Sequence, residues 1–339
     1  MTIENLEKEL KANKLQSIYL LYGEETFLLE SNFKKIKKLF GQTLKGINYV
    51  TIDENGLEQI IPELDTPSFG FEKKLIIAKN TAFFKKETKK KSKSESENLK
   101  TKLLEYLKNN FKNIKDSIVL IFIEEEANKN DLMEFIEKNG AVCNFEFQKP
   151  NQIQARIKAI TNAYKVNIDN VTISYFIECC GTNMQDLINE IRKLIEYVGE
   201  NGTITKEDID SLSIKKIESV IFDLTDSLGK KQTSKAIETL NNLIQNKEPV
   251  QKILITLYNN FKKLYLTKLA IASNKNIIEA LNLKPNQTFL VNKYKMQANY
   301  YNLKEMRIIL KELIDLDYKY KIGLIDLNVG FESILCAYC

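Results

Sequence analysis

Buried-strand patterns occur only in the first half of this chain, and that asymmetry limits the folds it can adopt. The chain has 339 residues, and five short, mainly apolar runs lie before residue 150, separated by helical patterns. These runs cover residues 17–22, 49–52, 74–78, 118–123 and 141–145. Continuous rather than alternating apolar strands are typical of a parallel sheet that helices cover on both faces. The first half is therefore predicted to be an α/β domain.

From Pro150 onward the apolar residues follow helical spacing instead. Three helices are predicted at residues 153–164, 172–180 and 184–198, and Thr205 and Asp208 indicate the capped start of another. Beyond Lys215 long amphipathic stripes predict a helical bundle, because such stripes more often form core seams than ligand sites. The predicted domains cover residues 1–148, 149–212 and 213–339.

Composition excludes several classes of function. The chain contains no histidine, which removes Ser–His and Cys–His nucleophile pairs and any metal site that needs imidazole. Its five cysteines do not form a secreted disulfide framework, and the C-x-x-C spacing of Cys336 and Cys339 lacks a second ligand pair. No catalytic or metal site is predicted. No apolar run is long enough to cross a bilayer and residues 1–15 lack a signal region, so we expect a cytoplasmic protein.

One segment carries charge equal to the whole chain's excess. Between Lys85 and Lys102 there are eight lysines and three glutamates, a net charge of +5, and the formal charge of the chain is also +5. The segment is either an arm that contacts phosphates or a solvated, mobile loop, and low-complexity charge runs favour the loop. A chain that is neutral elsewhere is not expected to bind nucleic acid strongly through its field alone.

A strand, a glycine and a helix stand where many proteins hold phosphates on backbone N–H groups. Here the turn is Gly23-Glu24-Glu25-Thr26, so carboxylates replace the lysine and hydroxyl of a phosphate loop, and no G-x-x-x-x-G-K-[ST] motif occurs. The fourth run ends in three glutamates, residues 124–126, which without a phosphate loop predict only a solvated strand end. The chain is therefore expected neither to hydrolyse ATP nor to need a cofactor.

The best candidate binding site is a bend rather than a cleft. Pro67, Ser68, Phe69, Gly70 and Phe71 place two aromatic rings in a Pro/Gly turn between a helix and a strand. The rings either fold back onto the sheet or form an apolar anchor at the tip of a turn, inserted into a partner's pocket. Spacing alone does not separate these two alternatives.

Several segments resemble one family in the same order along the chain. The opening segment, residues 18–28, resembles the start of the delta subunit of bacterial DNA polymerase III, the clamp-opening arm of the clamp loader. Further similar segments are residues 69–79, 183–194, 220–224 and 315–321. The resemblance spans nearly the whole chain, and it is the order and spacing of the segments together that make it specific.

The resemblance implies an AAA+-like α/β domain without a working ATP site, a small helical lid and a C-terminal helical collar. It also implies partners: the ring-shaped sliding clamp (beta subunit), the ATPase motor subunits and delta-prime, and primed DNA at the nucleoid. The subunit would open the clamp without catalysis of its own, within a DNA-directed DNA polymerase assembly. Pro67, Ser68 and Phe69 match the family's clamp-binding turn, with Phe69 on the family's phenylalanine, and Phe71 is a further candidate for clamp binding. Ser68 stands where a bulky apolar residue is common, which weakens the expected anchor.

Three alternatives remain open from the sequence. The chain could be an active AAA+ ATPase, although it lacks the phosphate loop. It could be a free-standing DNA-binding protein that uses the segment from Lys85 to Lys102. It could also belong to the clamp-loader family with Phe69 packed in the core.

Overall fold

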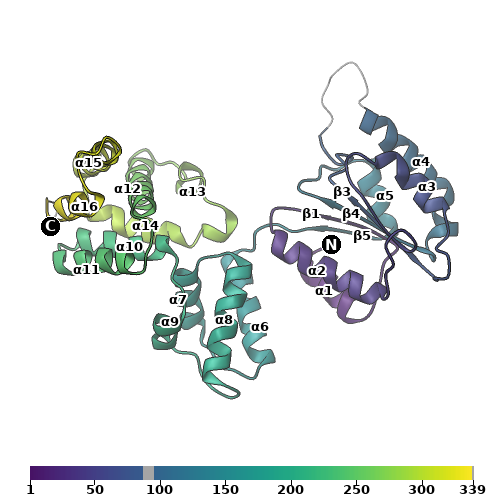
Figure 1. Cartoon of the computed structure of the whole chain (residues 1–339), viewed down its shortest axis with the longest axis horizontal. Coiled ribbons are helices and arrows are strands. Elements are labelled where there is room, and N and C mark those ends of the chain that lie inside the picture. The colour runs from purple at the N-terminus through teal and green to yellow at the C-terminus, as the bar shows by residue number, and fades with distance from the viewer. Residues whose placement is uncertain (87–94, 338–339) are drawn as a thin grey trace. The chain divides into compact units, whose positions relative to one another are not determined.

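The computed structural model describes residues 1–86 and 95–337, and the chain divides into two compact units, residues 1–147 and 148–339. All the strands of the described sheet lie in the first unit, and helices build the second (Figure 1). The predicted change from strands to helices near residue 150 is therefore confirmed. Whether the second unit contains a separate lid and collar stays a prediction.

Five parallel strands form the sheet of the first unit, in the order β2-β3-β4-β1-β5. The strands are β1 (Ile18–Tyr22), β2 (Tyr49–Ile52), β3 (Lys74–Lys79), β4 (Ile118–Glu124) and β5 (Ala141–Asn144). In the centre of the sheet Leu20 of β1 lies beside Phe122 of β4 and Val142 of β5. Strands β1, β3 and β4 are buried almost throughout, as their uninterrupted apolar sequences predict.

Helices cover both faces of this sheet (Figure 1). They are α1 (Ile3–Lys11), α2 (Thr26–Phe40), η1 (Leu57–Gln59), α3 (Ile60–Asp65), α4 (Glu95–Ile114) and α5 (Asp131–Asn139). One face packs against α3, α4 and α5 in a core that includes Leu20, Ile76, Leu107 and Ile136. Helices α1 and α2 lie on the opposite face. This two-sided burial explains why neighbouring residues of the central strands are all apolar.

The second unit is helical within its described residues, which end at 337. Its first helices are α6 (Pro150–Ala163), α7 (Asn170–Cys180), α8 (Met184–Val198) and α9 (Lys206–Leu212). The helices that follow are α10 (Ile217–Gly229), α11 (Thr233–Gln245), α12 (Val250–Ala272), α13 (Ile277–Ala280), η2 (Pro285–Gln287), α14 (Leu290–Asn299), α15 (Leu303–Lys321) and α16 (Leu327–Ala337). The predicted stripe on α12 is a core seam, since Leu257, Phe261 and Leu264 are buried in one cluster with Met306 and Leu313 of α15.

Local sequence signals account for several helix ends. Thr205 caps α9 and exchanges hydrogen bonds with Asp208, as the capping pattern predicts. The lysine-rich segment is expected to be a loop that passes into a helix near Leu99, and its described part agrees, because α4 begins at Glu95 and includes Lys100 and Lys102. The rest of that expectation concerns residues 87–94, which lie outside the described residues, as does Cys339.

None of the helices described is long and apolar enough to cross a bilayer. Within residues 1–86 and 95–337, no three His, Cys, Asp or Glu side chains gather closely enough to hold a metal ion. Cys143, Cys179 and Cys180 are buried and free, whereas Cys336 is exposed on α16.

Candidate functional site

The bend between α3 and β3 presents one aromatic ring to solvent. Phe69 is 90% exposed, which is the largest exposure of any described large hydrophobic side chain. Phe71 and Ser68 are half-buried, and Pro67 is exposed. The alternative in which Phe69 packs in the core is therefore wrong. A fully projecting ring has the geometry of an anchor that a partner's pocket can receive.

Hydrogen bonds inside the bend fix its shape. The Ser68 hydroxyl donates to the Phe71 carbonyl oxygen at 2.7 Å, and the Phe71 N–H donates back to the Ser68 carbonyl oxygen at 3.4 Å. Gly70, between them, has φ +77°, a conformation that glycine adopts without strain. Ser68 therefore closes the turn. The sequence indicated only that Ser68 stands where an apolar residue is common, and it did not indicate this hydrogen bond.

Two side chains from neighbouring elements hold the end of α3, just before the bend. The ammonium of Lys74, the first residue of β3, donates to the carbonyl oxygens of Glu63 and Thr66 at 2.9 and 3.1 Å and pairs with the Glu63 carboxylate at 2.5 Å. From α4, the hydroxyl of Tyr106 donates to Asp65. Neither residue was predicted from the sequence. The one available signal was a lysine that opens an otherwise apolar strand.

The turn after β1, where a nucleotide-binding protein would hold phosphates, is closed by the protein itself. The N–H of Gly23 donates to the Glu124 carbonyl oxygen at 3.3 Å, and the N–H of Glu25 donates to the Phe145 carbonyl oxygen at 2.8 Å. The N–H of Thr26 donates to the Glu24 carbonyl oxygen at 3.0 Å. Donors that would face a phosphate are thus already used by carbonyl groups.

The glutamates at the end of β4 differ from one another. Glu125 and Glu126 are exposed, as expected, but Glu124 is only 4% exposed, so the prediction of a wholly solvated strand end is wrong. The carboxylate of Glu124 accepts hydrogen bonds from the Thr81 N–H at 2.9 Å and from the Thr81 hydroxyl at 2.5 Å. Glu124 therefore fastens the segment after β3 to the end of β4 instead of facing a metal ion.

Burial raises the pKa of the Glu124 carboxyl above its ordinary value, although the hydrogen bonds from Thr81 oppose this shift. A raised folded-state pKa gives stability that is full below the unfolded-state pKa and is lost as pH rises through the folded-state pKa. Glu124→Gln removes that loss. We therefore expect the stability of the variant relative to the native chain to rise with pH once the pH exceeds about 4.5, the ordinary pKa of the group. Urea denaturation across this range measures the difference, and a difference that stays constant or falls with pH would contradict it.

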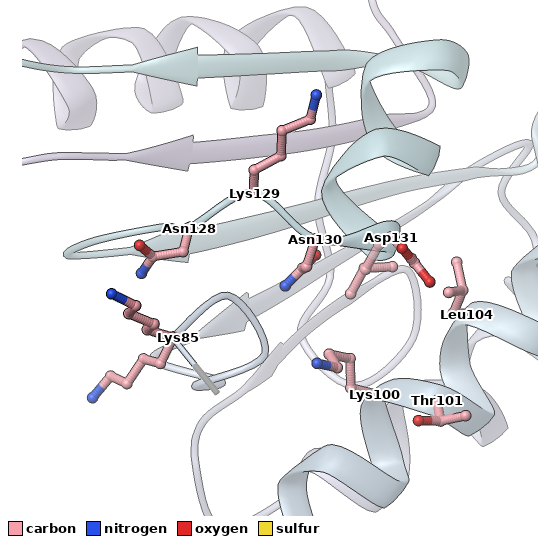
Figure 2. A pocket seen from close by; sticks show the side chains of 10 residues that line it. Lys85, Lys100, Thr101, Leu104, Asn128, Lys129, Asn130 and Asp131 are labelled. Carbon is pink, nitrogen blue, oxygen red and sulfur yellow. The ribbon is translucent and has the colours of Figure 1, made fainter. Parts of the chain in front are cut away.

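A second candidate surface is a hollow of about 560 Å³ lined by lysines (Figure 2). Its side chains come from the segment after β3, from the first half of α4, and from the start of α5 with the segment before it. The lysines are Lys85, Lys86, Lys100 and Lys129, and Asp131 is the one acidic residue among the described lining residues. Asn130 does not face a ligand with free groups, because it caps α5 and donates to the Phe83 carbonyl oxygen at 2.9 Å. The hollow is consequently cationic.

The two surfaces lie at opposite ends of the parallel strands. The bend precedes β3, so it lies at the amino ends of the strands. The hollow and the closed turn follow β1, β3 and β4, so they lie at the carboxyl ends. The predicted residues Pro67, Ser68, Phe69 and Phe71 are brought together in one turn, and the lysines that line the hollow lie at the other ends of the strands. In open α/β sheets small ligands bind at the carboxyl ends of the strands. An aromatic anchor at the amino ends therefore indicates a partner other than a small ligand.

A solved structure defines the fold of the chain. The chain is similar over 99% of its length to the Bacillus subtilis DNA clamp loader delta protein, with 99% of that chain covered, a TM-score of 0.77 and 21% identity. At this level of identity the likeness establishes the fold. The chain has an AAA+-like parallel α/β unit without a phosphate loop, followed by helices.

Family models and curated relatives then define the family. A model described as DNA polymerase III, delta subunit matches residues 19–146, and one described as DNA polymerase III delta subunit, C-terminal domain matches residues 218–338. The DNA polymerase III subunit delta of Bacillus subtilis (strain 168) is 24% identical over 97% of this chain and 94% of its own length. A probable DNA polymerase III subunit delta of Aquifex aeolicus (strain VF5) is 23% identical over 89% and 85%. The chain belongs to the DNA polymerase III delta subunit family, whose members serve DNA replication.

Proposed function

We propose that this protein is the clamp-loader subunit that binds the sliding clamp and opens it for loading onto primed DNA. The observation that carries the proposal is the 90% exposed ring of Phe69, held at the tip of a hydrogen-bonded turn. Burial of such a ring in a clamp pocket provides affinity, and Pro67, Ser68 and Phe71 shape the surface around it. The relatives' names support a role in the same assembly.

Opening of the clamp needs no chemistry at this chain. A ring that exists mostly closed and rarely open shifts toward the open form when a ligand binds the open form more tightly. The size of that shift is limited by the difference between the two affinities. The exposed aromatic anchor supplies attachment, and the contacts around it supply the preference for one clamp conformation.

Absence of ATP hydrolysis by this chain is part of the proposal. It is supported by the closed turn at Gly23, whose donors are used by Glu124 and Phe145, and by the missing phosphate-loop motif. Glu24 and Glu25 add negative charge where a triphosphate would lie. We expect millimolar ATP with Mg²⁺ to leave the melting temperature of the purified chain unchanged. A saturable rise in melting temperature would favour the ATPase alternative.

The second unit is the part that we expect to join the other subunits, the ATPase motors and delta-prime. Its last two helices and the turn between them carry exposed apolar side chains beside a well-formed core. Tyr318 is 63% exposed, Leu324 is 71% exposed and Val329 is 59% exposed. Exposed apolar groups gathered on consecutive elements are typical of a subunit interface, so we propose that α15 and α16 contact a neighbouring subunit in the cytoplasmic, nucleoid-associated complex.

The lysine-lined hollow supports a second role, contact with the phosphates of primed DNA. Loss of one phosphate contact lowers the slope of log K against log salt by about one unit. We expect Lys85→Gln together with Lys129→Gln to lower that slope by about two units for the full chain. Lys115→Gln is the matched control, because Lys115 is an exposed lysine at the opposite ends of the strands. Equal slopes for the double variant and the native chain would remove the hollow from the DNA contact.

Capture of the clamp tests the primary proposal directly. The purified full chain, immobilised without nucleotide, is expected to retain a bacterial sliding clamp from the same source and to release it when free chain is added. Failure to bind the clamp at micromolar concentration, with the chain folded by circular dichroism, would overturn the proposal. Strong clamp-independent DNA binding in the same preparation would favour the free-standing DNA-binding alternative.

A further inference from the structure

A buried lysine lies at the base of the Phe69 bend. The side chain of Lys74 is 3% exposed, although lysine is almost never fully buried unless it is paired. Its ammonium has three donors, and three oxygens receive them: the Glu63 carbonyl, the Thr66 carbonyl and the Glu63 carboxylate. Full satisfaction of the ammonium is what makes its burial tolerable.

The position of Lys74 ties together both ends of the segment that carries Phe69. Its backbone begins β3, where its N–H donates to the Ser117 carbonyl oxygen at 2.8 Å, so one end of the segment is fixed to the sheet. Its ammonium reaches back to Thr66, so the other end is fixed to the same residue. A cation beside the carbonyl groups at the end of α3 also satisfies acceptors that the helix leaves unpaired. The nine residues from 66 to 74 thus form a loop closed at its base by one side chain.

We infer that Lys74 is a positioning residue for clamp binding, and that it acts by holding the Phe69 turn in its binding conformation before the clamp arrives. This inference rests on the proposed function. An ordered loop loses less conformational entropy on binding than a mobile one, so affinity rises without any new contact to the partner. Lys74 does not itself face the clamp, because its side chain lies under the bend.

The test is Lys74→Met, which keeps the length and apolar stem but removes the charge. We expect the amides of residues 67–73 to exchange hydrogen about tenfold faster, while those of β1 and β4 keep their protection. Clamp affinity is expected to fall about tenfold. In a Phe69→Ala background the same substitution should cause no further loss. Assembly with the other subunits through residues 148–339 should be unchanged.

Two further variants keep the inference falsifiable. Tyr106→Phe removes the other hydrogen bond to the end of α3 but leaves the base of the loop closed, so turn exchange and clamp affinity should stay within about twofold of the native values. If Lys74→Met does not fold, Lys74→Gln takes its place: it removes the charge and one of the three donors, so smaller changes in the same direction are expected. Native exchange or native clamp affinity in a folded Lys74 variant, with Phe69→Ala defective, would overturn the inference alone. Native affinity in Phe69→Ala would overturn the proposed anchor and the inference with it.

Discussion

Substitution of Phe69 by alanine is expected to weaken binding of the full chain to the sliding clamp by about 30-fold and to leave its folding unchanged. The affinity loss follows from the aromatic ring, since burial of a side chain of this size contributes about 2 kcal/mol. The ring is 90% exposed in the free chain, so its removal deletes almost no internal contact. Surface plasmon resonance gives the affinity, and the melting temperature should stay within about 1 °C.

Tyr197→Ala is a matched control, because Tyr197 is also a large exposed aromatic side chain, 65% exposed, but lies in the second unit. It should leave clamp affinity unaltered. Phe71→Ala separates the two rings of the bend: Phe71 is half-buried, so its loss is expected to lower stability as well as affinity. A marked fall in melting temperature for Phe69→Ala, with clamp affinity intact, would contradict the anchor role.

Substitution of Gly23 by alanine is expected to destabilise the first unit by about 3 kcal/mol. Gly23 has φ +130°, and a Cβ at this position would lie 2.4 Å from the Phe145 carbonyl oxygen. A backbone atom cannot move aside as a flexible side chain can, so the turn after β1 and the segment after β5 must separate. Urea denaturation monitored by far-ultraviolet circular dichroism measures the change in the free energy of unfolding.

Gly41→Ala separates the two causes of this loss. Gly41 also has a positive φ, +96°, but no atom lies within 4 Å of a Cβ built there. Its replacement should therefore cost only the backbone term, about 1 kcal/mol. Equal destabilisation by the two variants would mean that the turn at Gly23 is not closed against Phe145, and it would reopen the case for a phosphate-binding turn.

The alternation of strands and helices was predictable because each central strand is buried on both sides. The burial leaves an unbroken apolar run that local periodicity detects, as in β1 and β4. Helix α1 was missed, although Thr2 caps it and Ile3, Leu6 and Leu10 follow helical spacing. The alternating charges between those residues masked a short amphipathic stripe.

The candidate site was predictable only in part. Turn residues around Phe69 indicated a bend, but whether its ring projects depends on tertiary packing, which no local pattern contains. The contacts that hold the bend are equally non-local in character. Lys74 bonds to Thr66 across the loop, and Tyr106 reaches Asp65 from 41 positions away in the chain. The burial of Glu124 was not predictable for the same reason. Its hydrogen-bond partner Thr81 lies 43 positions away in the chain, and this contact buries an acid that was expected to face solvent.

The closed turn after β1 has a consequence for any attempt to convert this scaffold into a motor. Its N–H groups already donate to the carbonyl oxygens of Glu124, at the end of β4, and Phe145, just after β5. Exchange of Glu24 and Glu25 for lysine and threonine would introduce residue types found in a phosphate loop, but it would not free the backbone N–H groups of the turn. The segment after β5 would also have to move away from the turn, so single substitutions are not expected to create a phosphate-binding turn here.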